Sequence, residues 1–188
     1  MKSNLPSVFK RLKKFGAPVS HYKVCSTFDS SPEIGSIGVA TEIGDAIFST
    51  DWVPLVVGAP DIQRYQAFGT LFAKSGASIH RLDRHPVMSR HPVTPMNEAD
   101  LTRHLTRQTN LKIGIISLAE IKAGQSHEAV SKCLSDGARI LAIDVVDDET
   151  LTEAGRLIWP IGSASCFAVG SQGIEYALVA HWLKIGTI

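Results

Sequence analysis

Pro54-Leu55-Val56-Val57-Gly58 is the stretch of this chain that decides the fold. A short, continuous apolar run of this kind is typical of a strand that is buried on both faces, as in a parallel sheet covered by helices. Similar β-rich runs recur along the chain and alternate with longer segments of helical pattern. This alternation predicts an α/β domain with a mostly parallel sheet and helices on both of its faces.

The alternation places about six strands along the chain, at residues 21–26, 54–58, 78–82, 112–117, 139–145 and 166–169. Helices are predicted between them over residues 6–15, 34–48, 62–74, 97–108, 126–135 and 149–158, and a last helix opens at residues 170–173 and runs to 182. Asn97 is a good N-cap for the fourth helix, whereas Gly69 weakens the pattern of the third. Because no linker or low-complexity tract interrupts the pattern, we expect a single Rossmann-like domain over residues 1–188.

The composition is that of an ordinary globular protein, with 44% hydrophobic and 20% charged residues. Nineteen basic against eighteen acidic residues leave a formal charge of +1, which argues against nucleic-acid binding. Three widely spaced cysteines suit reduced thiols and a cytoplasmic protein. No stretch approaches the roughly 20 apolar residues that cross a bilayer, so we expect no membrane partner. Residues 8–15 are basic and amphipathic. They are interpreted either as a packed helix with a solvated face or as a membrane-surface anchor.

A stiff cationic loop is predicted between the third strand and the fourth helix. It contains one arginine-histidine-proline-valine unit twice, as Arg84-His85-Pro86-Val87 and Arg90-His91-Pro92-Val93. Proline has no N–H and disfavours helical conformation in the residue before it, so we expect His85, His91 and Thr94 to lie outside helices and the segment to be a stiff loop. Arg84 or Arg90 could bind a carboxylate through two hydrogen bonds. The competing interpretation is a structural ion pair with Asp83 or Glu98.

Three further segments lie where a strand ends and a helix begins, the position at which parallel α/β sheets bind ligands. They are residues 25–31 (Cys-Ser-Thr-Phe-Asp-Ser-Ser), 35–38 (Gly-Ser-Ile-Gly) and 170–173 (Gly-Ser-Gln-Gly). The hydroxyls and carboxylate of the first suit a polyhydroxylated acid, and a capping turn is an equal alternative. The two glycine segments suit an anion at a helix N-terminus, although such segments are commonly structural. The last has neither the GxGxxG order nor the P-loop pattern.

Other kinds of chemistry find less support. His85 and His91 with Asp83 fit no standard zinc spacing, so no metal site is predicted. No GxSxG motif is present, and Cys25 is close to a histidine in sequence only. Glu175 is either a catalytic carboxylate or a first-turn charge that favours the helix dipole.

Four long stretches of the chain resemble a known family. They are residues 21–38 (His-Tyr-Lys-Val-Cys-Ser-Thr-Phe-Asp-Ser-Ser-Pro-Glu-Ile-Gly-Ser-Ile-Gly), 56–60 (Val-Val-Gly-Ala-Pro), 89–101 (Ser-Arg-His-Pro-Val-Thr-Pro-Met-Asn-Glu-Ala-Asp-Leu) and 169–178 (Val-Gly-Ser-Gln-Gly-Ile-Glu-Tyr-Ala-Leu). In this order they resemble the N-terminal, substrate-binding domain of the four-carbon acid sugar kinases, also called 3-oxo-tetronate kinases. The resemblance covers nearly the whole chain.

The resemblance implies a two-domain enzyme that transfers the γ-phosphate of ATP, with Mg²⁺, to 3-dehydrotetronate, threonate or erythronate. In that family the N-terminal domain holds the sugar acid and the C-terminal domain holds most of the nucleotide. Carried onto this chain, the resemblance assigns contacts with the substrate hydroxyls to Ser26, Thr27, Asp29 and Ser30. It assigns the side that faces the carboxylate or frames the pocket to Arg84, Arg90 and His91. It assigns the lining of the cleft to Gly170, Ser171, Gln172 and Gly173.

The chain also departs from the family pattern. It has no Ala-Asp-Asp-x-Thr-Gly-Ala type turn and no nucleotide-binding domain, and Val39 stands where a basic residue is expected. We therefore expect a partial domain without the first strand, with no independent kinase activity and no tight binding of ATP or Mg²⁺. A stand-alone binding module for a small hydroxy acid is one alternative. Another is a subunit of a split kinase whose partner is a separate nucleotide-binding domain. An exposed sheet edge would favour homo-oligomers.

Overall fold

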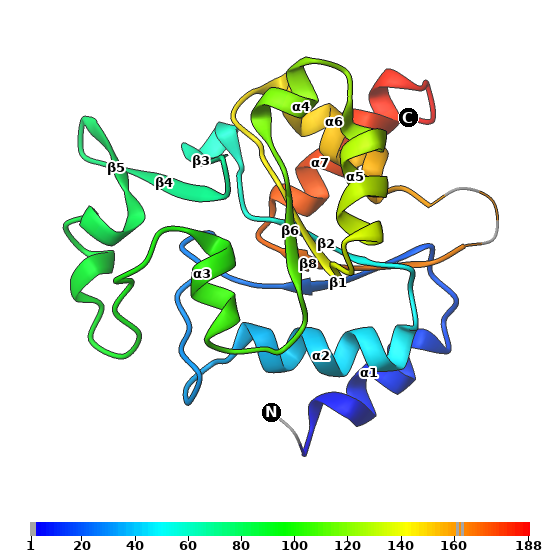
Figure 1. Ribbon diagram of the computed structural model, residues 1–188, viewed down its shortest axis with the longest axis horizontal. Coiled ribbons are helices and arrows are strands. Elements are labelled where there is room, and N and C mark those ends of the chain that lie inside the picture. Colours follow the sequence, from blue (N-terminus) through cyan, green and yellow to red (C-terminus); the bar gives the residue numbers. More distant parts are fainter. Residues whose placement is uncertain (1–2, 161, 163) are drawn as a thin grey trace.

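The computed structural model describes residues 3–160, 162 and 164–188, and its centre is a five-stranded parallel sheet (Figure 1). Its strands are β1 (Val19–Lys23), β2 (Val53–Val56), β6 (Ile113–Ile116), β7 (Ile140–Ile143) and β8 (Cys166–Gly170). They lie in the order β1-β8-β2-β7-β6, and all neighbouring pairs run parallel. This confirms the predicted α/β, Rossmann-like fold.

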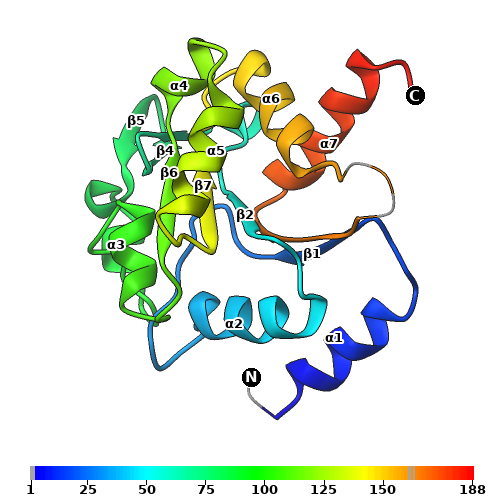
Figure 2. The same ribbon diagram turned by 45° about the vertical axis from the view of Figure 1, so that its right-hand side comes forward.

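Helices cover both faces of this sheet, as the two views in Figures 1 and 2 show. On one face lie α1 (Leu5–Lys13) and α2 (Ile37–Phe48), with α3 (Leu101–Thr106) beside them. On the other lie α4 (Leu118–Lys122), α5 (Ser126–Ser135), α6 (Asp148–Ile158) and α7 (Gly173–Lys184). Most of these helices begin or end within a few residues of their predicted positions, and α5 matches its prediction at both ends. Helix α4 was not predicted.

The buried strands supply two hydrophobic cores, because consecutive side chains of a strand point to opposite faces. Leu55 and Phe167 pack on the side of α1 and α2, whereas their neighbours Val56 and Ala168 pack on the side of α6 and α7. All residues of β2 and β7 are buried. These strands therefore consist of continuous apolar residues, without the polar alternation of a strand that has one face in water.

Residues 64–81 form a separate antiparallel sheet, so the helix predicted over residues 62–74 is wrong. This sheet contains β3 (Arg64–Ala67), β4 (Thr70–Ser75) and β5 (Ser78–Arg81) in sequence order. Phe68 and Gly69, both at positive φ, make the two-residue turn between β3 and β4 that such hairpins favour. Of the six predicted strands, the one at residues 78–82 belongs to this sheet, and the other five form the parallel sheet.

Helix α3 is shorter than the predicted helix over residues 97–108, because Asp100 and not Asn97 is its N-cap. The Asp100 carboxylate accepts hydrogen bonds from the backbone N–H groups of Thr102, at 2.9 Å, and Arg103, at 3.2 Å. Asp100 also forms a β-bridge with Thr70, which keeps the residues before the helix extended. The helix start is therefore set by contact with the antiparallel sheet.

Asp144 connects the two sheets. It follows β7 directly, is fully buried, and accepts hydrogen bonds from the backbone N–H groups of Phe68, Gly69 and Leu118. The last two of these bonds each measure 2.9 Å. Burial raises the pKa of Asp144 even though the three N–H donors favour its ionised form. One carboxylate thus fixes the β3–β4 turn against the edge of the parallel sheet.

We predict that Asp144→Ala lowers the free energy of unfolding by about 3 kcal/mol, because it leaves buried N–H groups without an acceptor. Asp148→Ala, at an exposed position in the first turn of α6, is the matched control and should cost no more than about 1 kcal/mol. Urea denaturation of the two variants measures the difference. Equal losses would show that Asp144 does not hold the hairpin.

Candidate functional site

The carboxyl ends of the parallel strands bring the first and third predicted segments together. Residues 25–31 follow β1 and residues 171–172 follow β8, and these strands are neighbours in the sheet. The backbone N–H of Val24 donates a hydrogen bond to the carbonyl oxygen of Gly170 at 2.7 Å, just beyond the paired strands. The hydroxyl-rich segment and the glycine corner therefore start side by side, at the edge where parallel α/β sheets bind ligands.

The Asp29 carboxylate connects the hydroxyl-rich segment to the cationic loop. Thr27 Oγ1 donates to Asp29 Oδ1 at 2.6 Å, and Thr94 Oγ1 donates to Asp29 Oδ2 at 3.3 Å. His91 Nδ1 in turn lies 3.1 Å from Thr94 Oγ1. Burial alone would raise the pKa of Asp29, but these hydroxyl donors contribute to holding it below the ordinary carboxyl value. Two segments 65 residues apart thus meet at one ionised carboxylate.

The cationic loop contains two short 3₁₀ helices, Leu82–Arg84 and Met88–Arg90, each followed by a His-Pro pair. Both of its predicted anion-binding arginines, Arg84 and Arg90, are exposed. Neither makes an ion pair or side-chain hydrogen bond among the described residues, so the structural pair with Asp83 or Glu98 is not formed. Asp83 pairs instead with Arg81. The loop therefore presents two guanidinium groups to solvent.

Ser30 faces the interior of the protein. Its side chain is 3% exposed, and its Oγ lies 2.9 Å from His104 Nε2 and 2.9 Å from Gln108 Nε2. Burial, and then the charge of Arg107, lowers the pKa of His104 to about 4, so this imidazole is neutral at physiological pH. The hydroxyl of Ser30 thus holds this segment against the protein interior through two distant side chains, while Asp29 beside it is only partly buried.

The glycine corner is packed tightly against β2. A Cβ atom at Gly170 would lie 1.9 Å from the carbonyl oxygen of Val56, and one at Gly173 would lie 2.1 Å from that of Gly58. Ser171 is fully buried, where its Oγ donates to the carbonyl of Val57 at 2.8 Å. Gln172 is partly exposed. These glycines are therefore required by the approach of two backbones, and Gln172 is the side chain of this corner that solvent reaches.

The remaining predicted positions have structural partners. Ser36 is the N-cap of α2, and the backbone N–H of Gly38 donates to Gln108 Oε1 at 3.2 Å, so this helix start is already occupied. Glu175 pairs with His21 at 3.0 Å in the first turn of α7. Ser26 is partly exposed beside Thr27, which is buried. Among the described residues no three histidine, cysteine or acidic side chains gather to hold a metal ion.

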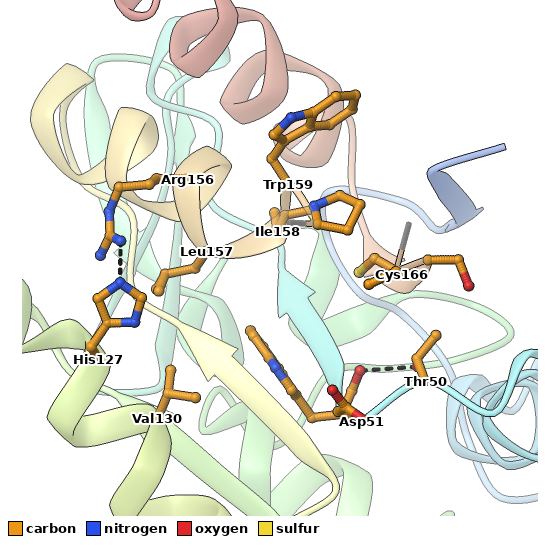
Figure 3. A pocket seen from close by; sticks show the side chains of 13 residues that line it. Thr50, Asp51, His127, Val130, Arg156, Leu157, Ile158, Trp159 and Cys166 are labelled. Atoms are coloured by element: carbon orange, nitrogen blue, oxygen red, sulfur yellow. Dashed lines mark hydrogen bonds between the residues drawn. The ribbon is translucent and has the colours of Figure 1, made fainter. Parts of the chain in front are cut away.

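A cavity of about 340 Å³ lies at the opposite edge of the sheet, where β2 and β8 begin (Figure 3). Asp51, Trp159 and Cys166 are among its lining residues, and Arg156 contacts His127 at its rim. None of the residues predicted from the sequence to bind substrate lines this cavity. It is therefore separate from the cluster around Asp29.

Sequence reasoning did not select Thr94 as a site residue, although its hydroxyl joins Asp29 to His91. The available signal was its place directly after the second His-Pro-Val unit. The sequence analysis did not select His104 either, and the structure places it in the buried network under Ser30. The separation of four residues between His104 and Gln108 within the predicted helix over residues 97–108 was the signal for that pair.

Fold and site together define a parallel α/β domain whose carboxyl edge carries hydroxyls, an ionised carboxylate and exposed arginines. The sequence matches the family described as "Sugar-binding N-terminal domain" over residues 1–178. The chain belongs to this family, and it corresponds to the N-terminal part of a four-carbon acid sugar kinase.

Individual relatives agree with this assignment. A 3-oxo-isoapionate kinase of Paraburkholderia graminis is 50% identical over 188 residues, which are 100% of this chain and 40% of that protein. A 3-oxo-tetronate kinase of Cupriavidus necator is 32% identical, over 89% of this chain and 37% of the relative. A solved Haemophilus influenzae structure of family DUF1537 has a TM-score of 0.82 and 25% identity, over 95% of this chain and 42% of that one. The chain thus spans about 40% of the length of these relatives.

We predict that the stability of the protein falls in acid because His104 is buried in its neutral form. Its folded pKa of about 4 lies below the unfolded value of 6.5, so the unfolded state binds the extra proton and stability is lost as the pH falls through this window. From pH 7 to pH 4 the loss should be about 3 kcal/mol. His104→Gln should lack this component. Urea titrations at both pH values test this, and equal pH dependence of the two proteins would contradict it.

Proposed function

We propose that this chain is the part of an ATP-dependent kinase that holds a four-carbon sugar acid. The observation that carries the proposal is the meeting of the hydroxyl-rich segment and the cationic loop at Asp29. It is supported by the names of the relatives, which are kinases of 3-oxo-isoapionate and 3-oxo-tetronate. Both names are those of sugar acids. A carboxylate that is hydrogen-bonded to a loop with exposed guanidinium groups matches the hydroxyls and the acid group of such a ligand.

Asp29 is suited to hold the hydroxyl groups of the acid. Each carboxylate oxygen has two lone-pair directions, and Thr27 and Thr94 each occupy only one of them. An ionised carboxylate therefore remains able to accept a hydrogen bond from a substrate hydroxyl. The same carboxylate repels the acid group of the substrate, which places that group toward Arg84, Arg90 and His91. Ser26 and Gln172 are the neighbouring partly exposed side chains that could complete the contacts.

The kinase reaction itself belongs to the whole enzyme of the relatives. Bound ATP with Mg²⁺ would supply the phosphoryl group, and the nucleotide would be held largely outside this chain. The described residues offer no cluster that would chelate the metal ion alone, so we assign no catalytic step to such a site here. What this chain contributes is the binding and orientation of the acceptor, which is a large part of phosphoryl-transfer catalysis. As part of the proposal we place the protein in the cytoplasm, where its three free cysteines stay reduced.

No helix of the described part of the chain has the length and apolar character needed to cross a membrane.

We expect calorimetry to detect binding of L-threonate or D-erythronate to the chain without ATP. Asp29→Asn should weaken this binding about tenfold or more, because a hydrogen bond to a charged group contributes about 1.5–3 kcal/mol. The matched control is Asp51→Asn, at the amino edge of the sheet beside the separate cavity. Thermal melting checks that both variants fold. Unchanged affinity in Asp29→Asn, or no binding by the wild-type chain, would contradict the proposal.

An activity assay distinguishes two arrangements of the whole protein, a split kinase and a stand-alone binding module. If the chain is a subunit of a split kinase, it should phosphorylate threonate or 3-oxo-tetronate only when a nucleotide-binding partner polypeptide is added. If it is a stand-alone binding module, it should bind the acid and show no activity with that partner. A coupled ADP-release assay with and without the remaining part of the Paraburkholderia graminis kinase decides between them.

A further inference from the structure

The two His-Pro-Val units of the cationic loop fold into turns of the same design. In the first, His85 Nδ1 accepts hydrogen bonds from the backbone N–H groups of Val87 and Met88, both at 3.2 Å. In the second, His91 Nδ1 accepts the backbone N–H of Thr94 at 3.0 Å. A ring nitrogen that accepts an N–H cannot carry a proton of its own, so a neutral ring carries its proton on Nε2. Backbone contacts therefore fix the tautomer of both histidines.

The two Nε2 atoms have different surroundings. His85 is 6% exposed, its ring packs against His80, and its Nε2 is 3.5 Å from the carbonyl oxygen of Lys74. His91 is only partly buried. Its Nε2 makes no hydrogen bond among the described residues and is not one of their buried unpaired atoms, so solvent reaches it. The Nε2 of His85 is thus buried near a backbone carbonyl oxygen, whereas the Nε2 of His91 is accessible to solvent.

The imidazole ring of His91 is also next to Asp29, the proposed partner of the substrate hydroxyls. Thr94 Oγ1 lies 3.1 Å from His91 Nδ1 and 3.3 Å from Asp29 Oδ2, so a single hydroxyl separates the imidazole from the carboxylate. A four-carbon acid is long enough to extend from Asp29 past Thr94 to the ring of His91. The ring is thereby held at a fixed spacing from Asp29, with Nδ1 toward Thr94 and Nε2 on the other edge of the ring.

We propose that the Nε2–H of His91 donates a hydrogen bond to the carboxylate of the bound sugar acid, and that His85 only builds the loop. This inference rests on the proposed function and deepens it by naming the atom that donates. The acceptor at Asp29 and the donor at His91 together set the orientation of the bound acid. Hydroxyls bind at the carboxylate end, and the acid group binds at the imidazole end. A neutral polyol of the same length lacks the group that His91 recognises.

The repeat supplies its own control, because the same substitution can be made in both turns. Asparagine has an amide oxygen near the position of Nδ1, where it can accept the backbone N–H as in an Asx turn, and it has nothing at the position of Nε2. His91→Asn should therefore keep the turn and weaken L-threonate binding about tenfold. His85→Asn should leave the affinity unchanged. Calorimetry with L-threonate, and with erythritol as the uncharged ligand, measures both.

A second measurement needs no ligand. In ¹⁵N-histidine NMR of the wild-type chain, both His85 and His91 should show an unprotonated Nδ1 and a protonated Nε2. A protonated Nδ1 in His91 at neutral pH would overturn the inference. Equal threonate affinity in His91→Asn and the wild type would also overturn it, while leaving the proposed function intact. Absence of threonate and erythronate binding by the wild type would overturn the proposed function, and the assignment of His91 with it.

Discussion

The buried carboxylate of Asp144 is the interaction on which the placement of the candidate site depends. It accepts the backbone N–H groups at the turn between β3 and β4, and so fixes the antiparallel sheet to the carboxyl edge of the parallel one. Strand β5 of that sheet leads directly into the cationic loop. The loop then returns to the parallel sheet through the contact of Thr94 with Asp29. An anchor at each end thus sets the loop over the strand ends.

The parallel part of the fold could be predicted from the sequence because its signals are local. Runs such as residues 54–58 are apolar throughout, and the intervening helices have caps and periodic apolar faces. The sequence does not predict the antiparallel sheet, because its strands are short and the pattern of residues 62–74 also fits a helix. Leu71 and Ala73 alternate with less buried neighbours, which is a period of two. Gly69 was the other signal, as a turn residue at positive φ and not a weak helix position.

For the candidate site, the sequence indicated which segments matter but not which way each side chain points. Residues 25–31 had two interpretations, a ligand contact and a capping turn. Ser31 makes a turn, because its Oγ accepts hydrogen bonds from the backbone N–H groups of Glu33 and Ile34, and the ligand contact stays a prediction. Asp29 contacts the loop across the site, while Ser30 is held inside by His104 and Gln108. No local pattern could distinguish them, because the partners of Ser30 lie more than 70 residues away. The roles of Arg84 and Arg90 in binding stay predictions.

The glycine corner has a consequence for how distant members of this fold can be recognised. At Gly170 and Gly173 a methyl group would collide with the main chain of the neighbouring strand, whatever ligand the protein takes. Selection on packing alone therefore suffices to retain both glycines, even in a descendant that has lost every polar contact to a sugar acid. The pair is a marker of ancestry, and a substrate has to be inferred from the side chains around it.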